Sequence, residues 1–101
     1  MTLDFFYNNY NLSDFDIKKL YIDNNKLYII AKYNVYLELI ANGYRPEMNM
    51  DVEKTFIFEC NHENMTFKYK KIEIVDYKDN ILTININNIL LKLTGNVNIM
   101  Q

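Results

Sequence analysis

Apolar and polar residues alternate with a period of two along Lys70–Leu93. The apolar positions form three groups: Ile72 and Ile74, then Leu82, Ile84 and Ile86, then Ile89, Leu91 and Leu93. A half-buried strand gives this period and a helix does not. Polar stretches at Lys78–Asn80 and Asn87–Asn88 separate the groups, and Asp and Asn tolerate the positive φ of hairpin turns. The segment is therefore predicted to be a three-stranded antiparallel meander.

Two segments of the preceding chain also predict strands. Lys26–Tyr33 and Val52–Cys60 are rich in β-branched and aromatic residues, which favour strands. Ser13 followed by Asp16 resembles a helix-capping box. The turn residues after Ile22 lead straight into the next strand, however, so we favour a strand over Asp16–Ile22 that pairs as a hairpin with Lys26–Tyr33.

Two further segments are ambiguous. Met1–Asn11 carries aromatic residues among Asn and Asp, which fits either an edge strand or a segment lying across the core. Asn34–Gly43 fits a short helix, with Asn34 as N-cap and Gly43 after its end, or a strand. Its Tyr, Val and Ile residues and its neighbouring strands favour the strand. Asn42–Asp51 is predicted to be the longest loop.

The last third adds two more predictions. Met65–Tyr77 is expected to be one long strand, with a bulge near Lys70–Lys71 that brings Ile72 and Ile74 into the core. Val97–Met100 is expected to add a short final strand. About seven or eight strands joined by polar turns predict a mainly β fold, a small antiparallel β-sandwich or a partly open barrel with room for one short helix. Residues 1–101 are expected to form a single domain.

Composition narrows the function classes. The net charge of −2 gives no general attraction to nucleic acid or to a membrane surface. A single cysteine cannot form an internal disulfide, and the first residues lack the pattern of a signal peptide, so a cytoplasmic location is expected. The excess of Asn, Ile, Lys and Tyr is typical of AT-rich coding sequence, which indicates a low-GC bacterium or its phage.

No set of residues predicts catalysis, a metal site or a cofactor. Cys60 and His62 are the only Cys and His, and a zinc site needs more ligands than these supply. A buried thiol followed by an exposed turn histidine explains the pair better than a nucleophile and its base. Lys68, Lys70 and Lys71 alternate with aromatic residues, but an exposed strand face explains them better than a nucleic-acid site.

The tyrosines say more about binding than the cysteine, histidine and lysine residues do. Nine tyrosines and no tryptophan occur, and several lie with Arg and Met around the predicted central loop, a mixture that protein interfaces favour. Codon usage and ordinary strand packing explain the same residues about as well. The candidate partner-binding residues are Tyr36, Glu38, Tyr44, Arg45, Glu47 and Asp51.

Asp14, Ile17 and Leu20, followed by a strand, a central loop and a Phe-rich strand, resemble the small β-rich immunity proteins of bacteria. No diagnostic motif accompanies them, so the sequence assigns no family. The function expected first is a non-enzymatic cytoplasmic protein that occludes a protein partner, as an immunity protein or a phage-borne inhibitor of a host system does. A basic protein is one expected kind of partner. The alternative is a homo-oligomeric structural or accessory β module, and a small enzyme built on Cys60 and His62 ranks third.

Overall fold

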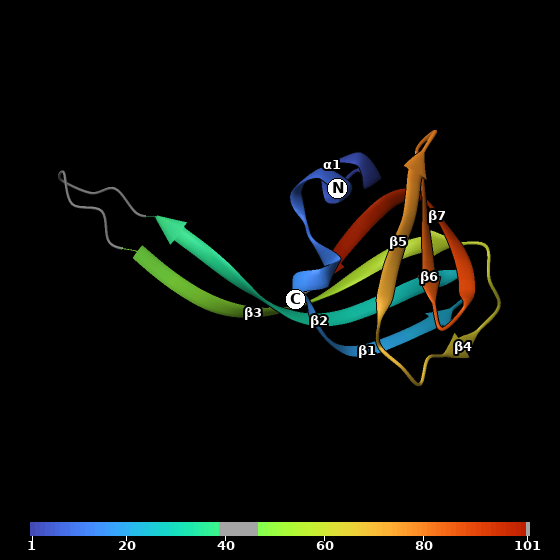
Figure 1. Ribbon diagram of the computed structural model, residues 1–101, viewed down its shortest axis with the longest axis horizontal. Helices are drawn as coiled ribbons and strands as arrows, with labels where there is room; N and C mark the ends of the chain where they lie inside the picture. The colour runs from blue at the N-terminus through green and yellow to red at the C-terminus, as the bar shows by residue number, and fades with distance from the viewer. Residues whose placement is uncertain (39–46, 101) are drawn as a thin grey trace.

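Seven strands form one antiparallel sheet in the computed structural model, which describes the backbone of residues 1–38 and 47–100 and the side chains of residues 1–34 and 50–100. The strands are β1 (Asp16–Asp23), β2 (Lys26–Glu38), β3 (Glu47–Cys60), β4 (Met65–Thr66), β5 (Ile72–Lys78), β6 (Ile81–Ile86) and β7 (Ile89–Met100). Their order across the sheet is β4-β1-β2-β3-β7-β6-β5. Figure 1 shows the sheet curling into a half-barrel, which confirms the mainly β class and the partly open barrel.

The sheet consists of two meanders joined side by side. Strands β1, β2 and β3 form one, β5, β6 and β7 form the other, and the pairing of β3 with β7 joins them. Three of the hairpins turn on the dipeptides Asn24–Asn25, Asp79–Asn80 and Asn87–Asn88, whose residues all have φ between 51° and 67°. Two consecutive positive φ values match the twist of the flanking strands. The predicted meander and both of its turns are confirmed.

The concave face of the half-barrel holds the core. Every second residue of the strands points into it, as in the pattern of β6, where Leu82, Ile84 and Ile86 are fully buried. Strands β2 and β3 contribute Leu27, Ile29, Ala31, Phe56 and Phe58. The period of two read from the sequence is thus the period of burial.

A short helix covers part of this face. Helix α1 (Leu3–Asn9) begins at Thr2, whose hydroxyl accepts a hydrogen bond from the Phe5 N–H at 3.1 Å, and a 3-10 turn, η1 (Leu12–Asp14), follows. Phe6 is 1% exposed and its ring meets that of Phe58 edge-on at 5.0 Å. The edge-strand alternative for Met1–Asn11 is wrong, and the segment does lie across the core. Among the described residues, no helix is long or apolar enough to cross a membrane.

The start of the chain is fixed to a bend in β7. Gly95 has φ +73°, and the register between β3 and β7 shifts beside it. The Val97 N–H donates to the Met1 carbonyl at 2.8 Å, and Thr2 forms a bridge with Asn96. Because residues on both sides of Gly95 belong to β7, Val97–Met100 continues that strand and is not the separate final strand that the sequence predicted.

The single strand predicted over Met65–Tyr77 is also wrong. The chain forms the two-residue β4 at one edge of the sheet and then crosses to β5 at the other edge, so it cannot stay in one ladder. Phe67 is buried at this crossing, and its N–H donates to the Leu20 carbonyl at 3.1 Å. The register shift falls between Ile74 and Asp76, beyond the predicted bulge, and Ile74 is 44% exposed because it lies on the open edge strand.

Candidate functional site

The two longest strands extend beyond the half-barrel as a two-stranded arm. Strands β2 and β3 pair without interruption from Lys26 opposite Glu59 to Glu38 opposite Glu47. On the outer sides, β1 reaches only Lys32 of β2 and β7 reaches only Thr55 of β3. Residues 33–38 of β2 and 47–54 of β3 therefore have a strand partner on one side only within the described chain, and Figure 1 shows them pointing away from the body. We call these residues the arm.

The register gives the arm one apolar and one polar set of positions. In the body, Ile29 lies opposite Phe56 on the core face. Continuing outward at a period of two, the opposed pairs at these positions are Ala31 and Lys54, Tyr33 and Val52, Val35 and Met50, and Leu37 and Met48, so Lys54 at the base is the one charged residue among them. The alternate pairs are Lys32 and Glu53, Asn34 and Asp51, Tyr36 and Asn49, and Glu38 and Glu47. Met50 is the outermost residue of this face whose side chain the structure describes, and it is 42% exposed.

Four of the six predicted partner-binding residues lie on the arm. Tyr36 and Glu38 are in β2, Glu47 and Asp51 are in β3, and all four occupy the polar set of positions. Asp51 accepts a hydrogen bond from the Asn34 amide at 3.2 Å. The other two, at positions 44 and 45, lie outside the described residues.

Part of the predicted central loop is therefore a strand. Glu47–Asp51 belong to β3, while residues 42–46 lie outside the described chain. The strand favoured over a helix for Asn34–Gly43 is confirmed as far as Glu38. The alternation of Met48, Met50 and Val52 with polar neighbours is the sequence signal that could have identified the outer half of β3.

A hollow of about 540 Å³ lies where the arm leaves the body. It is lined by residues of α1, η1, β2 and β3: Phe5, Asn9, Tyr10, Asn11, Asp14, Phe15, Tyr33, Asn34 and Lys54. The Phe15 ring stacks on Tyr33 at 5.1 Å and on Phe56 at 5.2 Å. Sequence reasoning missed this site because its walls come from segments that only the folded sheet brings together. Its volume is within the range of small-ligand sites.

The hollow is aromatic and hydrogen-bonding in character. Burial raises the pKa of both Tyr10 and Tyr33, and the neighbouring Tyr33 raises the pKa of Tyr10 further. Both phenols therefore stay protonated at neutral pH. Near the hollow, Lys18 lies 2.6 Å from Asp16, which lowers the pKa of that carboxyl. These groups can bind a partner by stacking and hydrogen bonds.

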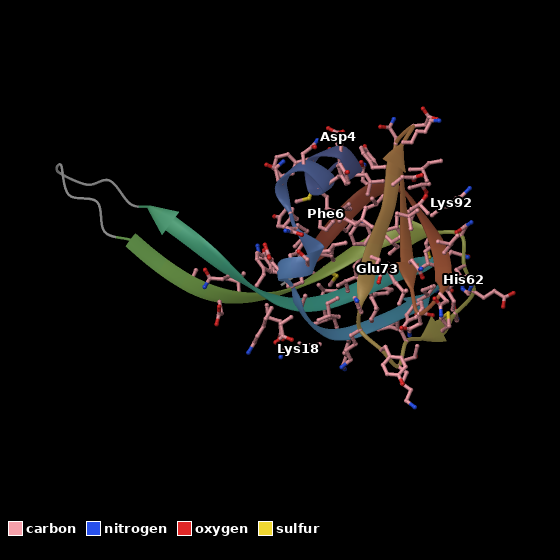
Figure 2. The ribbon with its side chains drawn as sticks, viewed as in Figure 1. Asp4, Phe6, Lys18, His62, Glu73 and Lys92 are labelled. Atoms are coloured by element: carbon pink, nitrogen blue, oxygen red, sulfur yellow. The ribbon has the colours of Figure 1, made fainter. Side chains whose placement is uncertain are left out.

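Cys60 and His62 lie close together in the sequence at the end of β3. Cys60 ends β3 and is buried, as predicted. His62 lies in the following turn, half-buried and not fully exposed, with Nδ1 3.1 Å from the Glu63 carbonyl. Across the described ranges, no three His, Cys, Asp or Glu residues gather closely enough to hold a metal ion. Figure 2 shows His62 at the end of the half-barrel away from the arm.

Comparison with protein-family models, curated proteins and solved structures gives no match. Function is therefore inferred from the arm and the hollow at its base.

Proposed function

We propose that the protein is a non-enzymatic cytoplasmic binding protein that occludes a surface of a protein partner, as immunity proteins and phage-borne inhibitors do. The observation that carries the proposal is the arm. A two-stranded ribbon alone is marginally stable in water. This one projects from a well-packed body, with both outer edges unpaired among the described residues and an apolar stripe that includes the exposed Met50. Such an arm gains stability when a partner covers it.

The charges of the arm favour a basic partner. Its β3 strand carries Glu47, Asp51 and Glu53, with Lys54 at the base as the single cation. Glu38 lies opposite Glu47 in the register, and like charges facing each other destabilise a strand pair. A partner with Lys or Arg would relieve this repulsion. An extended basic segment could also add to the free edge of β3 by strand addition, which supplies main-chain hydrogen bonds.

The test is co-purification of the tagged protein from its native host, with mass spectrometry of the proteins retained. We expect one stoichiometric basic protein. The double variant Asp51→Lys/Glu53→Lys should bind the purified partner at least about tenfold more weakly, chiefly through slower association, because complementary charge steers the encounter. Surface plasmon resonance at low and high salt measures both rates.

The matched control reverses two exposed carboxylates on the opposite edge of the sheet. Glu73→Lys/Asp76→Lys makes the same change in net charge on β5, far from the arm in the strand order. It should leave binding within about twofold of the unmodified protein, since only distant, screened charges change. If both double variants weakened binding equally, the effect would come from the change in net charge. The arm would then not be the contact surface.

A further inference from the structure

The two outer edges of the arm differ in charge. On β3, Glu47, Asp51 and Glu53 are spread along the edge. On β2, residues 33–37 are Tyr, Asn, Val, Tyr and Leu, without charge, proline or glycine, and Glu38 at the outer end is the single charged residue. Natural sheets protect exposed edges with charged residues or proline, and an uncharged β-rich edge is a template for another strand. The β2 edge of the arm is therefore the edge that favours pairing with another strand.

We infer that this edge pairs with the same edge of a second copy, antiparallel, about a two-fold axis at Tyr36. Strand β1 occupies the edge up to Lys32, and Phe15 stacks beside Tyr33, so within the described residues the free edge starts at Asn34. A two-fold axis at position 36 sets position 34 opposite 38 and position 35 opposite 37. This keeps the apolar positions together on one face, whereas a slip of one residue would mix the faces.

Charge complementarity favours this pairing. In it, Lys32 lies diagonally across from Glu38 of the second copy, at the roughly 7–8 Å spacing that long side chains can bridge. Within one chain the same two residues are six positions apart along β2, about 20 Å at the usual rise of a strand, so they cannot pair there. Within its own chain, Lys32 lies opposite Asp16 of β1 and Glu53 of β3, and Asp16 also contacts Lys18 at 2.6 Å, so Glu38 of the second copy would add a further carboxylate beside Lys32.

The corresponding pairing of β3 with itself is disfavoured in the registers centred on Asn49, Met50 and Asp51. An axis at Met50 sets Glu47 opposite Glu53, an axis at Asp51 sets that carboxylate against its own copy, and an axis at Asn49 sets Glu47 opposite Asp51. Each arrangement places like charges directly across a ladder. Pairing of two copies is therefore favoured at the β2 edge. The acidic edge of β3 is then free to bind the proposed partner.

Pairing also remedies the weakness of the arm. Two separate two-stranded ribbons become one four-stranded sheet with a continuous apolar stripe, the arrangement that gives a sheet independent stability. Glu38 takes part in both proposals, but the dimer does not require the partner, because the carboxylates that test the partner, Asp51 and Glu53, lie on β3. Each idea can therefore fail without the other.

Sedimentation equilibrium over a wide concentration range, with native mass spectrometry, tests the dimer. We expect a monomer–dimer equilibrium. Lys32→Glu and Glu38→Lys should each raise the dissociation constant about three- to tenfold, and the combined swap should return it close to the original value, because each dimer contains two such diagonal pairs. Lys19→Glu, an exposed charge change on β1, is the control and should leave the constant unchanged.

Hydrogen exchange locates the contact. Backbone amides of residues 34–38 should gain protection as concentration rises, and those of residues 47–51 should not. A monomer at every concentration overturns the inference. So does a dimer in which the charge swap fails to restore affinity, or one in which β3 gains the protection, since another surface would then hold the copies together.

Discussion

Single tyrosines serve different parts of the structure. Tyr10 and Tyr33 line the hollow, while Tyr21 and Tyr28 stack against each other at 4.8 Å across the β1–β2 ladder. The Tyr77 hydroxyl lies 3.3 Å from an Asp4 carboxylate oxygen and so ties β5 to α1. Packing between strands and against the helix thus explains the positions of these tyrosines, whereas codon usage explains only their number.

Alkaline pH should destabilise the protein through three of these phenols. Burial raises the pKa of Tyr10, Tyr33 and Tyr77, and for Tyr77 the Asp4 carboxylate adds to the effect. The folded state therefore holds these protons more tightly than the unfolded chain. Stability should be full below the unfolded pKa of about 10 and fall as pH rises through the folded values. Thermal melting at increasing pH, followed with tyrosine ultraviolet absorbance, measures the loss.

The control for this prediction is Tyr33→Phe, which keeps the ring and removes one raised phenol. Its melting temperature should depend less on alkaline pH than that of the unmodified protein. An identical pH dependence in both proteins would mean that Tyr33 titrates as it does in the unfolded chain.

At the scale of elements, α1 carries two adjacent phenylalanines, one buried against the sheet and one exposed. Phe6 is 1% exposed and lies against Phe56 and Phe58, whereas Phe5 is 52% exposed. Phe6→Ala should cost about 3–5 kcal/mol of unfolding free energy, as other buried Phe truncations do. Phe5→Ala, its matched control, should cost less than about 1 kcal/mol. Urea unfolding measures both, and equal losses would mean that α1 does not cover the core.

Elements with sustained alternation could be predicted from the sequence, and short ones could not. Leu82, Ile84 and Ile86 mark β6 because strand period and burial coincide. Helix α1 has seven residues and only two buried ones, too few to show a helical period. The break after Thr66 depends on β4 and β5 lying on opposite edges of the sheet, which no local pattern records.

At the scale of the whole molecule, the arm and the body should differ in local stability. Residues 27–31 of β2 lie between two strands, whereas residues 34–38 have a partner on one side only among the described strands. In dilute solution, amides of residues 34–38 should exchange much faster than those of residues 27–31, because opening the arm exposes less buried surface. Hydrogen exchange with mass spectrometry resolves the two halves of this strand. Similar protection in both would show that the arm is as stable as the body.

The candidate site was predictable in part. Tyr36, Glu38, Glu47 and Asp51 stand out by residue type, and the register of β2 with β3 places them on one set of positions. The arm itself follows from where β1 and β7 stop pairing, and that depends on long-range contacts. The hollow likewise requires η1 to lie beside β2 and β3.

The seam between β3 and β7 has a consequence for how the chain acquires its fold. Each meander is built from hairpins between neighbouring strands, but the seam joins Thr55 to Met100 and Cys60 to Leu93 across the whole second meander. Pairing of distant segments is slow because a long loop must close first. During synthesis, the edge of β3 that pairs with β7 must therefore stay open until the last residues of β7 leave the ribosome.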